Sequence, residues 1–172
     1  QQSPPNVQSF IIKRDDCQFH IVPLAYYQVQ AEVKSVSRYR WDKNTVLSPL
    51  DLALAWGELT ADRADNYITY SQSGRWYSFW YSGDSPWKKD FIQKHSGNHH
   101  ILPANDNIKN IVLTIREHDQ VRLAGWLVSV VLATNGSLRE IWRSSLSRDD
   151  TGDGSCEVFW VTEVQIGTDI YR

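Results

Sequence analysis

Residues 119–145, DQVRLAGWLVSVVLATNGSLREIWRSS, decide the fold class that the sequence predicts. Asn135-Gly136 separates two runs rich in β-branched and aromatic residues, and this dipeptide is the strongest short-range indication of a two-residue hairpin loop. The loop requires positive φ at both positions. Gly125, inside the first run, predicts a sharp bend or a close approach of another backbone. The hairpin register pairs these residues across the two strands: Ala133 with Leu138, and Val130 with Ile141.

Three further segments carry strand patterns. In residues 25–39 polar and apolar side chains alternate until the phase changes, which predicts a half-buried strand with a β-bulge near Lys34 and Ser35. Residues 156–164, CEVFWVTEV, predict the last strand. Residues 75–82, RWYSFWYS, predict a strand with aromatic side chains on both faces, either a core strand between layers or a stacking surface. Strands of this kind favour an antiparallel, barrel-like sheet of the OB or SH3-like type.

Three short helices complete the predicted α+β fold. Residues 48–57, SPLDLALAWG, begin with Ser48 as a cap and Asp51 at the position of a capping-box acid, and they end at a glycine. A second helix is expected over residues 85–95. The third is expected over residues 105–116, where isoleucine and valine recur at helical spacing.

Length and charge limit the class of protein. The chain has 172 residues and a formal net charge of −2, from 18 basic and 20 acidic residues. We expect residues 1–9 to be a flexible lead and residues 10–172 to form a single globular domain. No apolar run approaches the roughly 20 residues that span a bilayer, so no transmembrane segment is expected. The balanced charge argues against nucleic acid as a partner.

The N-terminal residues and the cysteines bear on the compartment. The sequence begins QQSPPNVQSF and contains no Met. This favours a periplasmic or otherwise exported protein, with a signal or a membrane anchor removed during processing, and a trimmed chain is the alternative. Cys17 and Cys156 are the two cysteines. In an exported domain they are a candidate disulfide, and two unrelated buried thiols are the alternative.

Residues 95–105, HSGNHHILPAN, hold three of the five histidines. We expect a turn there, followed by a short extended piece. Because side chains alternate along an extended chain, His99 and His100 would point to opposite faces. No HExxH or CxxC motif accompanies the histidines, so no metal and no other cofactor is expected.

Residues 144–157, SSLSRDDTGDGSCE, form a second polar segment. Its acids resemble the start of a calcium-binding loop, but the twelfth position falls on Trp160, so the EF-hand interpretation fails. Nucleophilic catalysis would need a base and an orienting acid beside a nucleophile. The candidates for such a constellation are His95, Ser96, Ser145 and Asp150, and Cys156 with a histidine is a comparable pair. The candidates for ligand binding are Asn98, His100, Arg148, Asp149, Thr151 and Glu157.

Four segments together resemble a family of uncharacterised bacterial proteins, most of which carry export or membrane-anchor signals. These segments are LSPLDLALAWG, HSGNHHILPAN, VRLAGWLVSV and WRSSLSRDDTGDGSCEVFWV. The resemblance covers roughly residues 20–165. It implies export, and it assigns no activity and no catalytic residue to this chain.

Two classes of function remain open from the sequence. The preferred one is an exported binding or assembly module of the bacterial cell envelope, with a polar patch built from residues 95–105 and 144–157. Its partner would be a protein or a small ligand in the envelope. The alternative is a small hydrolase that uses a His/Ser/Asp constellation in the same patch, and an enzyme is the less expected of the two.

Overall fold

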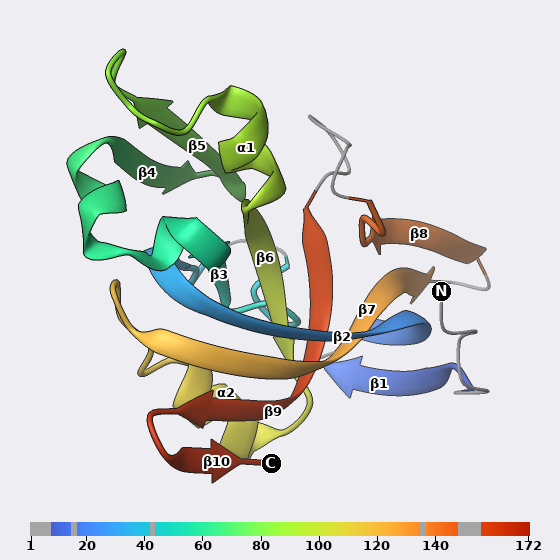
Figure 1. Cartoon of the computed structure of the whole chain (residues 1–172). Coiled ribbons are helices and arrows are strands. Elements are labelled where there is room, and N and C mark those ends of the chain that lie inside the picture. Colours follow the sequence, from blue (N-terminus) through green and yellow to red (C-terminus); the bar gives the residue numbers. More distant parts are fainter. Residues whose placement is uncertain (1–7, 15–16, 42–43, 135–136, 148–155) are drawn as a thin grey trace.

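A computed structural model describes residues 8–14, 17–41, 44–134, 137–147 and 156–172. In these residues the strands form one large sheet and a separate two-stranded sheet (Figure 1). The strands are β1 (Phe10–Arg14), β2 (Cys17–Arg38), β3 (Leu50–Ala55), β4 (Ile68–Ser73), β5 (Trp76–Tyr81), β6 (Ser96–Pro103), β7 (Gln120–Thr134), β8 (Ser137–Arg143), β9 (Glu157–Ile166) and β10 (Asp169–Tyr171). The helical elements are the 3-10 turns η1 (Gly57–Thr60) and η2 (Asp62–Asn66), and the α-helices α1 (Lys89–Lys94) and α2 (Asp106–Val112).

The large sheet has the strand order β1-β2-β3-β6-β9-β7-β8, and β10 pairs with β9. The long strand β2 also pairs with β7, over residues 18–32, before it pairs with β3 over residues 32–38. The strand pairs are antiparallel apart from β6 and β9, which run parallel. β4 and β5 form the small sheet, which stands above the large one in Figure 1.

The predicted fold class is wrong. The described chain is mostly β rather than α+β, and its α-helices are α1 and α2 instead of the three that the sequence predicted. Its main sheet is one large mixed sheet, not an antiparallel barrel of the OB or SH3-like type. The parallel pair β6–β9 lies within this sheet, and β6 comes from a segment whose sequence predicted a turn.

The helix predicted over residues 48–57 is a strand. All six residues of β3 are buried, so both faces of this strand pack against other elements. A strand that is buried on both faces does not alternate between polar and apolar residues, and its continuous apolar run also satisfies helical spacing. The Ser48 side chain donates to the Leu50 carbonyl oxygen at 3.2 Å. The capping-box residues therefore stabilise the start of a strand.

The turn predicted within residues 95–105 is also wrong. Residues 96–103 are strand β6, and all eight are buried. The second predicted helix is shorter than expected and corresponds to α1. The third corresponds to α2, where the Asn105 side chain accepts a hydrogen bond from the Ile108 backbone N–H at 2.9 Å, as an N-cap does.

The predicted hairpin forms between β7 and β8. Ala133 pairs with Leu138, as predicted. Val130 pairs with Trp142 rather than with Ile141, because the register shifts by one residue between Val130 and Val131. The loop residues 135 and 136 lie outside the described residues.

Two other backbone features were predicted correctly. The register of β2 against β3 shifts between Val33 and Ser35, which confirms the bulge near Lys34. Gly125 permits a close backbone approach, because a Cβ atom built there would lie 2.0 Å from the Trp160 carbonyl oxygen. The core-strand interpretation of residues 75–82 is wrong, since Trp80 of β5 is 60% exposed.

The core lies on both sides of β3, β6 and β9. One side holds the largest apolar cluster, with Leu52, Ile101 and Phe159 from these strands, and α2 packs against it with Ile108 and Val112. The opposite side holds a second cluster, which includes residues of β6, β7 and β9. In the part of the chain that the structure describes, no helix is long and apolar enough to cross a membrane. Because apolar clusters cover both sides of β3, β6 and β9, the polar residues on these three strands are buried between packed layers.

Candidate functional site

The strongest candidate site lies on one face of β3, β6 and β9. Asp51 of β3 is directly opposite His100 of β6, and His100 is directly opposite Val158 of β9. Residues that are opposite each other in a sheet project from the same face. Cys156 lies two residues before Val158, so the same alternation brings its thiol to this face.

Three groups lie together there. The His100 Nδ1 atom lies 2.9 Å from Asp51 Oδ2 as an ion pair. Cys156 and His100 line the same cavity, and the Asn98 side-chain amide donates to Cys156 Sγ at 3.7 Å. An acid, a histidine and a thiol thus follow one another in that order, from the buried interior toward the half-buried Cys156.

The Asp51 carboxylate is fully buried and has several other partners. Arg75 Nη1 donates to Oδ1 at 3.1 Å, and the Tyr39 hydroxyl donates to Oδ2 at 3.1 Å. The Ser48 hydroxyl lies 3.5 Å from Oδ1. A buried carboxylate is tolerated only when it is paired and hydrogen-bonded, and these contacts fix the Asp51 side chain beside His100.

Aromatic rings hold the two cations in place. The Trp142 ring is parallel to the His100 ring, with 5.0 Å between their centroids. The Arg75 guanidinium lies over the Tyr39 ring at 3.9 Å and near the Trp142 ring at 5.1 Å. Arg75 Nη2 also donates to the Ser48 carbonyl oxygen at 2.9 Å. Stacked rings of this kind limit the orientations that the imidazole and the guanidinium can adopt.

The surroundings of His100 favour its protonated form. Burial alone would lower the pKa of His100, but the hydrogen bonds and charges of Asp51 and Cys156 outweigh burial and raise the pKa to about 9. At neutral pH the imidazole is therefore an imidazolium held between a carboxylate and a thiol. Such a cation stabilises a neighbouring thiolate.

A cavity of about 370 Å³, which we call the Cys156 cavity, opens beside these groups. It is lined by Arg75, Trp76, His100, Ile141, Trp142, Arg143, Cys156 and Val158. The lining comes from β5, β6, β8 and β9 together with the residues that precede β5 and β9. A small molecule in this cavity would meet the thiol and the imidazole on one wall.

A second polar group lies on the opposite face of the same strands. The Tyr27 hydroxyl is 3.1 Å from His99 Nε2, and His99 Nε2 is 3.8 Å from a Glu157 carboxylate oxygen. A cavity of about 530 Å³, the Trp56 cavity, adjoins them. It is lined by Ala25, Tyr26, Tyr27, Gln28, Val29, Gln30, Trp56, Leu127, Ser145, Leu146 and Glu157. His99 and His100 thus point to opposite faces, as predicted.

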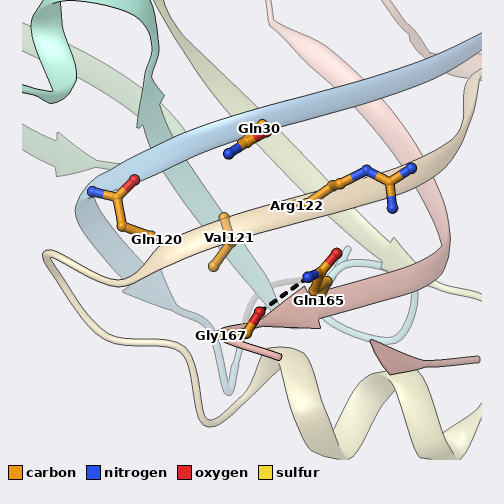
Figure 2. A pocket seen from close by; sticks show the side chains of 6 residues that line it. All are labelled: Gln30, Gln120, Val121, Arg122, Gln165 and Gly167. Carbon is orange, nitrogen blue, oxygen red and sulfur yellow. Dashed lines mark hydrogen bonds between the residues drawn. The ribbon is translucent and has the colours of Figure 1, made fainter. Parts of the chain in front are cut away.

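A third hollow lies across β2, β7 and β9 and has a volume of about 170 Å³ (Figure 2). Gln30, Gln120, Val121, Arg122, Gln165 and Gly167 line it. The Gln165 side-chain amide donates to the Gly167 carbonyl oxygen at 3.0 Å, the contact that Figure 2 marks. None of these six lining residues is a thiol, an imidazole or a carboxylate, so this hollow offers amide and guanidinium donors but no nucleophile or base.

One cluster has side chains that could ligate a metal ion: Glu32, Asp65 and His118. The Lys34 ammonium lies 2.7 Å from Glu32 Oε1 and 2.7 Å from Asp65 Oδ1. His118 Nδ1 is 3.3 Å from the same Glu32 oxygen. The two carboxylates already share a cation, so we interpret this cluster as a structural ion-pair network.

The predicted catalytic residues have local contacts. His95 Nδ1 is 2.9 Å from the Phe91 carbonyl oxygen, and its ring stacks on Phe91 at 3.9 Å. The Ser96 hydroxyl donates to the Ile92 carbonyl oxygen at 2.8 Å. The Ser145 hydroxyl donates to the Ser147 carbonyl oxygen at 2.9 Å. Asp150 lies outside the described residues.

The predicted binding residues divide into two groups. Asn98, His100 and Glu157 are buried. Asn98 Oδ1 accepts from the Gln72 side chain at 2.7 Å, which ties β6 to β4. Arg148, Asp149 and Thr151 lie outside the described residues.

The end of the 144–157 segment lies beside residues 95–105. Glu157 of β9 pairs with His99 of β6, and the Asn98 amide donates to Cys156 Sγ at 3.7 Å. Residues 148–155 of that segment lie outside the described residues. The shared region is buried at β6 rather than exposed as a surface patch. Cys17 and Cys156 are both free thiols, so the candidate disulfide is not present in the structure.

Sequence reasoning missed Asp51, Arg75 and Trp142. Asp51 is a single acid within the apolar run LDLALA, and an acid in a buried strand indicates a carboxylate with dedicated partners. The sequence gives no such indication for Arg75 or Trp142. They belong to the β4–β5 and β7–β8 hairpins, and the spacing of residues in a hairpin does not show what the hairpin packs against.

Comparisons of the chain with known protein families, with curated proteins and with solved structures give no match. The resemblance to a family of bacterial proteins therefore stays a prediction. The contacts and the geometry of the site alone support a function for the chain.

Proposed function

We propose that the protein is a small thiol-dependent hydrolase that cleaves acyl bonds, with Cys156 as the nucleophile. The observation that carries this proposal is that Cys156 and His100 line one cavity, with His100 paired to the buried Asp51 behind it. A nucleophile, a base and an acid that orients the base are the three groups that acyl transfer needs. From the sequence, a small hydrolase with a His/Ser/Asp constellation is the alternative function. The function proposed here is also a hydrolase, with a cysteine as the nucleophile in place of a serine.

The reaction proceeds in two halves. Cys156 reacts as the thiolate, with its proton already on the His100 imidazolium, and its sulfur forms a bond to the acyl carbon of the substrate. The bond from that carbon to the leaving group breaks as His100 returns its proton to the leaving atom. Water then attacks the thioester and His100 takes its proton, the C–S bond breaks, and a carboxylic acid is released as the Cys156 thiolate and the His100 imidazolium are restored.

Other residues have supporting roles in this scheme. Asp51 fixes the orientation of the imidazole and stabilises the imidazolium. Trp142 covers one face of the ring. The Asn98 amide, which points at Cys156 Sγ, is placed to stabilise negative charge next to the reacting carbon.

The test uses the second cysteine as an internal control. Cys17 is also a free, half-buried thiol, so Cys17→Ser removes a thiol without touching the proposed machinery. After mixing with 4-nitrophenyl acetate, intact mass analysis should show one acetyl group on the wild type and on Cys17→Ser. Cys156→Ser and His100→Gln should lose this adduct, with a loss of about 10²–10⁴ in acylation rate for the base variant.

Acetylation that persists in Cys156→Ser, or that occurs equally at both cysteines, would contradict the proposal. Near-UV circular dichroism of each variant shows whether its packing is retained. A folded His100→Gln variant with the wild-type acylation rate would contradict the role of His100 as the base.

The binding or assembly role is the second candidate, and the Trp56 cavity favours it. Its volume of about 530 Å³ and its aromatic lining by Tyr26, Tyr27 and Trp56 suit a small ligand. In that role the protein would act in the bacterial envelope. If the protein binds a small ligand and no cysteine is acylated, the binding role is favoured over the hydrolase.

A further inference from the structure

The charged residues that line the Cys156 cavity are basic, in contrast to the slightly acidic chain as a whole. Among its eight lining residues, Arg75, His100 and Arg143 are basic, and none is acidic. The whole chain has a formal net charge of −2. A concave site lined by one sign of charge concentrates ligands of the opposite sign.

Two of these basic groups face the same acid, and the third has an exposed partner. Asp51 lies behind the cavity wall and contacts both Arg75 and His100. Arg143 forms an ion pair with Glu140 at 3.3 Å, and the two side chains are 60% and 47% exposed. Ion pairs that are this exposed to solvent are weak. An incoming anion can therefore replace Glu140 as the partner of Arg143.

The two arginines differ in the contacts that hold them. Arg75 is fixed by Ser48, by Asp51 and by the rings of Tyr39 and Trp142. Arg143 is at the end of β8 and reaches the cavity from its rim. Arg143 is therefore the residue that can close on a ligand, and its planar fork suits a carboxylate.

The rest of the lining is apolar. Trp76, Ile141, Trp142 and Val158 complete the cavity and give a ligand a place for carbon atoms next to the charged end. A ligand with both an apolar part and an anionic group matches this lining best.

We propose that the acyl substrate carries a carboxylate or a similar anionic group near its reacting carbon, and that Arg143 is the specificity-determining residue that binds it. The inference rests on the proposed function, because it names the substrate class of the same thiol. Its test uses alkylating reagents, which need the thiolate but not hydrolysis, so the two proposals can fail separately.

The experiment compares iodoacetate with iodoacetamide. In both reactions the Cys156 thiolate forms a bond to the CH₂ carbon, the C–I bond breaks, and iodide leaves. The reagents are nearly equal in size and differ in the charge of the carboxylate against the amide. Peptide mass analysis gives the rate at which each reagent modifies Cys156, and the iodoacetate rate is divided by the iodoacetamide rate. Dividing this ratio by the same ratio for N-acetylcysteine isolates the preference of the site for an anion.

We expect a normalised ratio above one for the wild type, and a fall of about two- to fivefold in Arg143→Gln, as the loss of one partly exposed charge contact predicts. The matched control is Arg139→Gln, which removes an exposed arginine of the same strand that does not line the cavity. It should keep the wild-type ratio. The iodoacetamide rate in Arg143→Gln should match the wild type, which shows that the site is intact.

An equal fall in Arg139→Gln, or an unchanged ratio in Arg143→Gln, would overturn the inference. If Cys156 reacts faster than Cys17 with both reagents but shows no preference for the anion, the anionic substrate class is wrong and the hydrolase proposal stands. If Cys156 reacts no faster than Cys17 with either reagent, both proposals are wrong.

Discussion

At the scale of single residues, His99 and His100 separate two environments across one strand. His99 faces Tyr27 and Glu157, and His100 faces Asp51 and Cys156. Because the strand alternates, neither ring can move to the other face without a register slip of β6. The two cavities are therefore separated by the thickness of one strand.

The protonation of His100 predicts a pH dependence of stability. Its pKa is raised to about 9 in the folded protein, against about 6.5 in an unfolded chain. The stabilisation is complete below about pH 6.5 and is lost as the pH rises through 9. The free energy of unfolding in urea should therefore fall between these values, by up to about 3 kcal/mol.

The variant His100→Gln isolates this contribution. It is expected to be less stable than the wild type at pH 6.5, and the difference should shrink toward pH 9.5. Wild-type and variant stabilities that run parallel across this range would show that His100 is not a cation in the folded state.

Part of the site could be predicted from individual residues. The opposite directions of His99 and His100 are a consequence of strand alternation alone. The pairing of His100 with Asp51 could not be predicted, because it depends on the β3–β6 register, and the pattern of residues 48–57 predicts a helix in place of β3. The sequence suggests Cys156 as a partner of a histidine, but it does not indicate which histidine.

At the scale of elements, hydrophobic pattern identified half-buried strands better than fully buried ones. β2 and the β7–β8 hairpin have alternation or turn residues that identify them. β3 and β6 have neither, since both of their faces are covered. The polar residues of β6 are typical of a turn when the sequence is considered alone, because their partners on β3 and β9 are not apparent from it.

Gly125 provides the test at this scale. In Gly125→Ala the new methyl group would overlap the Trp160 carbonyl oxygen, where the β7 register shifts against β9. We expect a loss of about 3 kcal/mol in the free energy of unfolding, from overpacking between two backbones. Chemical denaturation measures it.

The matched control for that variant is Gly83→Ala. A Cβ atom built at Gly83 has nothing within 4 Å, so its stability should stay within about 0.5 kcal/mol of the wild type. Equal effects of the two variants would contradict the close approach of β7 and β9.

At the scale of the whole molecule, the large sheet and the β4–β5 ribbon differ in burial. β6 is buried throughout, whereas β5 has exposed positions along its length. The ribbon packs on a small cluster that includes Ile68 and Trp87. Its residue Trp76 lines the Cys156 cavity, so the less buried element borders the candidate site.

Hydrogen exchange should separate the two sheets. Amides of β4 and β5 are expected to exchange through local opening, at free energies well below that of global unfolding. Amides of β6 and β9 should exchange only through global unfolding. Exchange followed by mass spectrometry in increasing urea tests this, and equal protection of β5 and β6 would contradict it.

Fold class was the least predictable property at this scale. The strands and several turns are local, but the mixed sheet depends on the parallel pairing of β6 with β9, which no local pattern encodes. Export and the resemblance to a bacterial family stay predictions, because no observation of the structure bears on them.

The long ladder between β2 and β7 has a consequence for the protein during its synthesis. Residue 18 pairs with residue 133 and residue 32 with residue 120, so β2 leaves the ribosome long before its partner exists. At about 5–20 residues per second the delay is on the order of ten seconds. During this time the nascent chain exposes unpaired backbone groups of a long, partly apolar strand to neighbouring chains. A chaperone that holds nascent chains at the ribosome would therefore matter more for the yield of this protein than for one built from local hairpins.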